Sequence, residues 1–341
     1  MYWIIVIHVA GSTPWYLLKP QTFGWQACNF WDAIARFGVP IFMMISGTLF
    51  LNPNRQVTTQ HLFKKNIARL LWAYLVWSIV YTIYDLLTNN RPVQLSYIIE
   101  KLLLGSYHMW FVLAMVCLYL AVPIYRLITA RPKLLRYTLA LMLLFGCLLP
   151  SLLTLLKAIR PLMGLSGLRM YHALKTLYHA SWCQFFTGFS LVYLGGYWLS
   201  QHDFSNKQRK AVYLLGLLGL LYTIGMSGWL AKLFGKPIGV FYDNLSWNVL
   251  AVAAAIFVFA KQHWGSWPSP RWLAKTANLI FGTYLVHVLI LYLFIYQLHI
   301  RIIAHNPLWF VPLFSMLIFL ISLGGAAYVL SLIPWVNKHA M

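Results

Sequence analysis

One histidine, His8, lies within the apolar run IIVIHVAG near the start of the chain, and another, His287, lies within FGTYLVHVLIL. Ionisable side chains are costly inside apolar segments and often mark functional sites. A neutral imidazole, with a reference pKa of about 6.5, can take a proton from a hydroxyl group. His8 is therefore a candidate general base or transient acyl carrier. The alternative is a structural histidine bonded to a neighbouring helix.

An arginine stands at the start of a second apolar run, WDAIARFGVPIFMMISGTLFL. Arg36 follows Asp32 by four residues, so the two side chains share a helix face and can pair. Pro40 should loosen the helix and free carbonyl groups toward a cavity, which favours a functional role for Arg36. The alternative is a helix-end arginine whose side chain only reaches the membrane interface. The small pair Ser46-Gly47 suits either close helix packing or the approach of a substrate.

The segment LFKKNIARLL places three cations, Lys64, Lys65 and Arg69, at the start of the next apolar run. Such a group can hold a polyanion such as a nucleotide phosphate, or can serve only as a topology signal. Asp85, near the far end of that run, is a rare carboxylate that could orient a histidine.

Aromatic residues give two further candidates. Trp110, in HMWF, is either a stacking platform for a carbohydrate or an ordinary aromatic residue of the membrane interface. Tyr284 precedes His287 by three residues, so both share a helix face and either line a cavity or fill the bundle.

Metal and hydrolase chemistry receive no support from the sequence. The four cysteines, Cys28, Cys117, Cys147 and Cys183, are widely spaced, which favours buried thiols over a disulfide framework or a metal motif. No HExxH, GxSxG, P-loop or dinucleotide motif occurs in a suitable context.

The elements that must position these residues are membrane helices. The chain of 341 residues is 61% hydrophobic and 9% charged, against about 25% charged residues in soluble proteins. This composition predicts an all-α, polytopic bundle that forms a single domain over residues 1–341. The excess of 26 basic over 5 acidic residues is explained by membrane lipids and cytosolic loops, not by nucleic acid.

Ten apolar segments are predicted, and all but the first are long enough to span a bilayer as a helix. They are residues 1–11, 33–52, 66–88, 108–128, 134–156, 182–199, 211–231, 245–262, 277–298 and 308–333. Alternate loops carry 15 and 10 Lys or Arg residues, so both termini are expected in the cytosol. The basic, aromatic loop 157–181 falls on the outer side and is predicted to be re-entrant or interfacial.

Several of these stretches together resemble acyltransferase family 3, whose members acylate cell-surface carbohydrates. IIVIHVAG resembles the first helix of the family, and RFGVPIFMMISGTLFL resembles its most specific motif. HMWFVLAMVCLYLAVP, FGTYLVHVLIL and, more weakly, FFTGFSLVYLGGYWLS resemble later motifs, in the same order. Within the family, the chain is most similar to the compact sugar O-acetyltransferases of the enterobacterial common-antigen type.

The resemblance implies a ten-helix enzyme of the bacterial inner membrane. It would move an acetyl group from acetyl-CoA to a hydroxyl of a cell-surface or lipid-linked glycan, without a bound cofactor. His8 would act as base, Arg36 and Ser46 would stabilise the oxyanion if they face one cavity, and Lys65 with Arg69 would hold the coenzyme phosphates. The sugar would stack on Trp110, and Tyr284 and His287 would line the same cavity.

The sequence departs from the family pattern at two places. An arginine usually precedes the histidine of the first helix by eleven residues, and counting back from His8 passes Met1. The sequence therefore predicts that the natural start lies about 15–20 residues upstream, since the first helix must span. Asn66 also stands where many family members have a basic residue, and Lys65 can supply that positive charge instead.

Two rival interpretations stay open at this level. A glycan or lipid transporter explains the helices, the basic loops and the intramembrane arginine, but not the matches of His8, Arg36, Ser46 and His287 to family positions. An inactive, shortened family member is the other.

Overall fold

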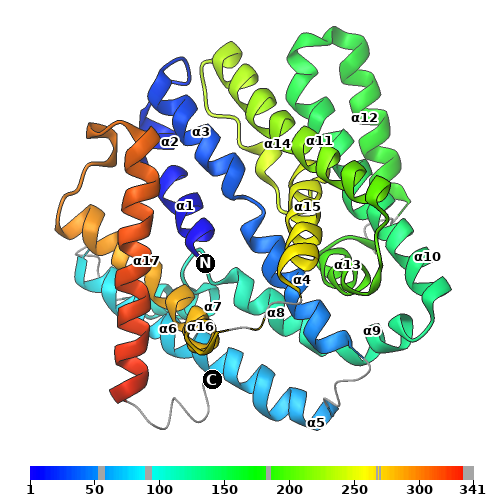
Figure 1. Cartoon of the computed structure of the whole chain (residues 1–341). Coiled ribbons are helices and arrows are strands. Elements are labelled where there is room, and N and C mark those ends of the chain that lie inside the picture. Colours follow the sequence, from blue (N-terminus) through cyan, green and yellow to red (C-terminus); the bar gives the residue numbers. More distant parts are fainter. Residues whose placement is uncertain (53–57, 89–93, 182–185, 266–267, 269, 333–341) are drawn as a thin grey trace.

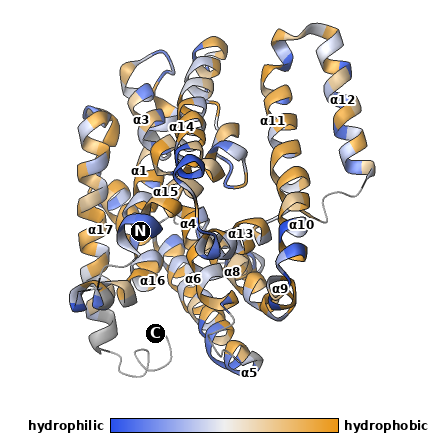
Figure 2. Cartoon of the chain, turned by 45° about the vertical axis from the view of Figure 1, so that its right-hand side comes forward, coloured by the Kyte–Doolittle hydropathy of each residue, from blue (hydrophilic) through white to orange (hydrophobic). Residues whose placement is uncertain are grey.

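The computed structural model describes residues 1–52, 58–88, 94–181, 186–265, 268 and 270–332. Within these ranges the chain forms helices and contains no strand, as the composition predicts. The helices pack side by side into a bundle (Figure 1), and many of their outward faces are hydrophobic (Figure 2). The prediction of a polytopic helical bundle is confirmed.

The helices have the following bounds. The α-helices are α1 (Tyr2–Ala10), α2 (Thr13–Leu17), α3 (Phe23–Ala35), α4 (Gly38–Leu51), α5 (Thr59–His61), α6 (Ala68–Thr88), α7 (Leu95–Leu104), α8 (Trp110–Leu120), α9 (Val122–Thr129), α10 (Pro132–Leu143), α11 (Leu149–Ile159), α12 (Gly164–Ala180), α13 (Ser190–Gln201), α14 (Asn206–Phe234), α15 (Trp247–Trp264), α16 (Arg271–Tyr292) and α17 (Pro307–Leu332). Three π-helical segments, η1 (Leu62–Ile67), η2 (Leu144–Leu148) and η6 (Leu293–Gln297), and three short 3₁₀ segments, η3 (Arg160–Leu162), η5 (Val240–Tyr242) and η7 (Ile302–Ala304), extend or join them.

Among the described residues, seven helical segments are long and apolar enough to cross a membrane. The bent pair α8 and α9, which meet at 56°, raises this number to eight if the pair forms one span. The predicted number of ten membrane helices is therefore not shown by the described residues. Helix α1 has 9 residues, which agrees with the prediction that the first apolar segment is too short to span. Helix α13 has 12 residues and is shorter than predicted, while residues 182–185 before it lie outside the described part.

The predicted span 33–52 begins earlier than expected. Helix α3 starts at Phe23, where the Thr22 side chain accepts a hydrogen bond from the Trp25 amide. The helical path is then interrupted between α3 and α4, at Arg36 and Phe37. Pro40 has no amide to donate to the carbonyl of Arg36, which explains the interruption and agrees with the predicted loosening.

Residues 157–181, predicted as a loop, are mostly helical. Helix α11 continues to Ile159, and α12 runs from Gly164 to Ala180 after a short turn. Gly164 has φ +61°, a conformation that favours glycine at this turn. Helices α11 and α12 lie side by side at the edge of the bundle (Figures 1 and 2).

Helices α4 and α13 pack with their backbones in close approach. A Cβ atom at Gly47 would lie 1.9 Å from the Tyr193 carbonyl oxygen, and one at Gly196 would lie 2.3 Å from Met44 Cα. Thr48 also donates a hydrogen bond to the Gly196 carbonyl. Gly47 is therefore needed for the close packing of α4 on α13. Ser46 lies on another face of α4 and is available for other contacts.

Helix α1 lies inside the bundle against α3, α16 and α17 (Figure 1). Its residues Ile5, Val6 and Val9 are buried against apolar residues of these helices. This placement carries His8, near the end of α1, into the interior of the molecule.

Loops that the charge pattern assigns to one side contact one another. Arg126, at the end of α9, donates to the carbonyl of Phe50 at the end of α4. Lys261, at the end of α15, donates to the carbonyls of Leu199 and His202 near the end of α13. These contacts agree with the predicted alternation of loops, and which side is cytosolic stays a prediction.

Candidate active site

Three histidines from different helices and loops form a cluster in the bundle interior. The ring centroids of His8 and His287 lie 5.2 Å apart, as do those of His108 and His287, and those of His8 and His108 lie 6.4 Å apart. His108 and His287 are buried, whereas His8 is partly exposed to a cavity. We call His8, His108 and His287 the histidine cluster.

A hydrogen bond to a backbone carbonyl fixes the tautomer of the buried His287 ring. His287 Nδ1 lies 2.6 Å from the Tyr284 carbonyl oxygen, so this nitrogen must carry the proton and donate. His287 Nε2 is then an acceptor in the neutral ring, and it has no hydrogen-bond partner among the described residues. The Tyr284 hydroxyl donates to the His108 carbonyl at 2.5 Å and ties α16 to the start of α8.

His8 has a partner that can set its tautomer. Its Nδ1 lies 3.0 Å from the Tyr107 hydroxyl oxygen. When Nδ1 carries the proton and donates to this oxygen, Nε2 holds the lone pair that a general base needs. The hydroxyl therefore suits the orientation of the imidazole for proton transfer.

A cavity of about 520 Å³, the central cavity, opens beside His8. Arg36 and Tyr107 line it together with His8. Arg36 forms two hydrogen bonds with the buried carboxylate of Asp32, at 2.8 Å and 2.7 Å, and its guanidinium lies 4.8 Å from the Tyr242 ring centroid. The predicted Asp32–Arg36 pair is thus present, and it holds the guanidinium at the wall of the cavity that contains His8.

Two further cavities adjoin the central cavity. One, of about 630 Å³, shares Tyr107, Tyr292 and Tyr296 with it, and we call it the tyrosine cavity. The other, of about 550 Å³, shares Gly11, Tyr16 and Arg36, and we call it the Lys157 cavity after another residue of its lining. The three together are called the polar groove.

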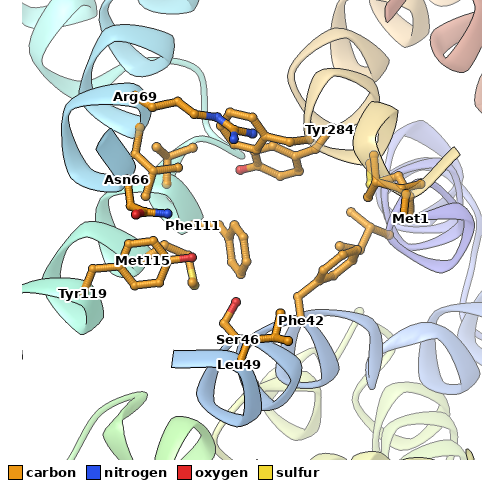
Figure 3. Close-up of a pocket in the computed structure, with 16 residues that line it drawn as sticks. Met1, Phe42, Ser46, Leu49, Asn66, Arg69, Phe111, Met115, Tyr119 and Tyr284 are labelled. Carbon is orange, nitrogen blue, oxygen red and sulfur yellow. The ribbon is translucent and has the colours of Figure 1, made fainter. Parts of the chain in front are cut away.

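A fourth cavity, of about 350 Å³, lies elsewhere around α4, α6, α8 and α16. Its lining is mostly aliphatic and aromatic, with Ser46, Asn66 and Arg69 as polar members, and we call it the apolar cavity (Figure 3). The Arg69 guanidinium lies 5.3 Å from the Phe281 ring centroid. Tyr284 also lines this cavity, and its ring contacts His108 and His287. Tyr284 therefore joins the apolar cavity to the histidine cluster.

The structure separates residues that the sequence grouped. Arg36 lines the polar groove and Ser46 lines the apolar cavity, so the condition for a shared oxyanion role, that both face one cavity, is not met. Lys65 is exposed on η1 and lies outside the lining of the apolar cavity, whereas Arg69 belongs to it.

The structure gives other contacts to Trp110 and Asp85, whose expected roles stay predictions. Trp110 stacks on Phe189 with 5.4 Å between ring centroids and lies outside the lining of the four cavities. Asp85 accepts a hydrogen bond from Tyr97 and lies 3.7 Å from Lys101 Nζ, and neither of these partners is a histidine.

Sequence reasoning missed Tyr107 and the placement of His108. Tyr107 and His108 lie just before Trp110 in the chain, but their partners His8 and His287 are about a hundred or more residues away. Nothing in local spacing reveals such a contact. The available signal was the occurrence of a histidine within each of three family-like motifs, those of His8, His108 and His287.

Comparison with known proteins assigns a class to this fold and site. A family model described as an acyltransferase domain, that of acyltransferase family 3, matches residues 1–329. The chain therefore belongs to this family of membrane acyltransferases, which favours chemistry over transport. No curated protein and no solved structure matches the chain.

Proposed function

We propose that this protein transfers an acetyl group from acetyl-CoA to a hydroxyl of a cell-surface or lipid-linked glycan at the bacterial inner membrane. The observation that carries the proposal is the position of the histidine cluster. It contacts Tyr284, which lines the apolar cavity, and it supplies His8 to the polar groove. A donor and an acceptor can thus approach one group of imidazoles from two cavities.

The apolar cavity suits the donor. Its aliphatic and aromatic lining fits the pantetheine arm, which has few charges, and Arg69 is a cation at its wall. Lys65 is exposed one helical turn before Arg69, so it can meet the coenzyme phosphates outside the cavity. In the proposed topology, with both termini in the cytosol, this cavity is reached from the cytosolic side.

The central cavity suits the acceptor. The His8 imidazole removes the proton of a sugar hydroxyl as its oxygen attacks the thioester carbonyl carbon. The resulting oxyanion is stabilised by hydrogen-bond donors, among which the Arg36 guanidinium lies in the same cavity. As the tetrahedral intermediate collapses, the carbon–sulfur bond breaks, the proton passes from His8 to the coenzyme A thiolate, and the acetyl ester remains on the sugar.

The substitution His8→Ala tests this assignment. Membranes that contain each variant are supplied with labelled acetyl-CoA, and acetyl transfer to envelope glycan and release of free thiol are measured. Removal of a general base should lower the rate by about 10²–10⁴-fold. His263→Ala, which changes an exposed histidine on α15, is the matched control and should retain full activity.

Wild-type transfer by the His8→Ala variant would refute the catalytic role of His8. Absence of thiol release and of glycan acetylation by the wild-type protein would refute the whole proposal. The closer resemblance to common-antigen sugar O-acetyltransferases stays a prediction, which the identity of the acetylated glycan tests.

A further inference from the structure

We propose that the polar groove binds an extended, uncharged saccharide that passes His8, so that an internal sugar residue, not a chain end, is acetylated. This inference rests on the proposed function for the identity of the reaction. It adds the length and charge of the acceptor, which follow from the arrangement of the three cavities and their lining.

The position of His8 within the groove gives the first argument. The central cavity contains His8 and shares lining residues with the tyrosine cavity through Tyr107 and with the Lys157 cavity through Arg36. Each of the three volumes falls within the range of small-ligand pockets, about 300–1,000 Å³. A single sugar would fill one of them, whereas an oligosaccharide can occupy all three with His8 opposite a middle residue.

The tyrosine cavity provides surfaces and donors typical of sugar binding. The rings of Tyr84 and Tyr292 stack at 5.9 Å between centroids, and Tyr292 also contacts Tyr296 at 5.6 Å. Such rings offer apolar faces to sugar rings and hydroxyl groups to their oxygens. The buried hydroxyl of Tyr84 has no hydrogen-bond partner among the described residues, which points to a ligand as the missing partner.

The charges of the groove indicate a ligand without net charge. In the tyrosine cavity Asp85 lies 3.7 Å from Lys101, and in the central cavity Arg36 is paired with Asp32. The Lys157 cavity contains Lys157 together with Asp243. Opposite charges thus accompany one another along the groove, which is unfavourable for a polyanion such as a nucleic acid or a phosphate-rich lipid headgroup.

Equilibrium binding tests the length dependence. The probe is a ladder of monosaccharides to hexasaccharides, prepared by partial acid hydrolysis of the de-O-acetylated envelope glycan of the host. Binding to the full chain in lipid nanodiscs is measured without acetyl-CoA, so the result does not depend on acetyl transfer. Affinity should rise by about tenfold or more from monosaccharide to tetrasaccharide, because further rings add net hydrogen bonds.

Variants at the two ends of the groove test its extent. Tyr84→Phe removes only the unpartnered hydroxyl, and Lys157→Ala removes an exposed side chain, so neither should unfold the protein. Each should weaken tetrasaccharide binding by about fivefold, because each removes a contact at one end of the groove. Tyr213→Phe, whose hydroxyl is also buried without a partner among the described residues, and Lys133→Ala, an exposed lysine on α10, are the matched controls.

Three results would overturn the proposal. They are affinity that does not depend on saccharide length, equal effects of the groove and control variants, and acetyl esters found by mass spectrometry only on terminal residues of the product. If the wild-type protein binds the ladder as expected but transfers no acetyl group, the proposed function fails and the groove assignment stands. Binding of no member of the ladder overturns the groove assignment even where transfer from acetyl-CoA is observed.

Discussion

The apolar cavity and the polar groove differ in nearly every property that decides which ligand a cavity accepts. The first has a volume of about 350 Å³ and places Arg69 among aliphatic and aromatic side chains. The second consists of three larger cavities whose walls carry tyrosines, paired charges and His8. The difference indicates two chemically distinct substrates, and in the proposed reaction these are a coenzyme thioester and a saccharide.

The two regions meet through very few residues. Helix α16 supplies both Tyr284, which lines the apolar cavity, and His287, whose ring lies 5.2 Å from that of His8. The Tyr284 hydroxyl holds the His108 carbonyl, and the Tyr284 carbonyl holds His287 Nδ1. Tyr284 therefore fixes the positions of His108 and His287. The geometry between the apolar cavity and the polar groove thus depends on α16.

The largest expected effect concerns Arg36. Arg36→Gln leaves the Asp32 carboxylate, which is 1% exposed, without its partner. Removal of one member of a buried ion pair costs about 3–5 kcal/mol, so the variant should melt at a clearly lower temperature in nanodiscs. Acetyl transfer should be lost as well.

A double variant separates structure from chemistry at this position. Asp32→Asn combined with Arg36→Gln removes both charges and should recover most of the thermal stability. If Arg36 acts on the oxyanion in the groove, activity stays low in the recovered protein. Full recovery of activity would show that Arg36 only neutralises Asp32.

Arg69 tests the donor side of the comparison. Arg69→Ala should raise KM for acetyl-CoA by about 10–100-fold, because charge-assisted hydrogen bonds contribute about 1.5–3 kcal/mol. KM for the saccharide should not change, since Arg69 lies outside the lining of the groove. Steady-state kinetics with each substrate varied in turn measures both values. A rise in the saccharide KM alone would reverse the assignment of the two cavities.

Tyr107 tests the acceptor side with a smaller change. Tyr107→Phe removes the hydroxyl that lies 3.0 Å from His8 Nδ1 and leaves the ring in place. The loss of one hydrogen bond, about 1 kcal/mol, should lower kcat by about fivefold. KM for acetyl-CoA should stay constant, and Tyr213→Phe should match the wild type. An unchanged kcat would mean that the bond does not orient the base.

The sequence predicts the class of fold well because composition and periodicity are local properties. The apolar segments, the Asp32–Arg36 pair four residues apart and the interruption near Pro40 all follow from short-range rules. The number of spans is less predictable. Helix α3 starts ten residues before the predicted span, and α13 is shorter than expected, because packing and not hydropathy alone sets where helices end.

The site is predictable only in part. His8 and His287 are identifiable because an ionisable residue in an apolar run is conspicuous wherever it occurs. Their contact with His108 and Tyr107 depends on how distant helices pack, which no single sequence spacing encodes. The stacking of Trp110 on Phe189, from a segment nearly eighty residues later, has the same origin.

Ser46 provides the smallest and most discriminating test. The family-like motif of α4 suggests that Ser46 works with Arg36, but the two residues line different cavities. Ser46→Ala should therefore change kcat by about twofold or less, since a partly exposed hydroxyl that has no part in the oxyanion contributes little. Its neighbour Gly47 must not be replaced in the same experiment, because a Cβ there would collide with the Tyr193 carbonyl. A loss of about a hundredfold or more would instead match the removal of an oxyanion donor. The oxyanion would then be held by Ser46 from the apolar cavity as well as by Arg36 from the groove, as the family-like motif implies.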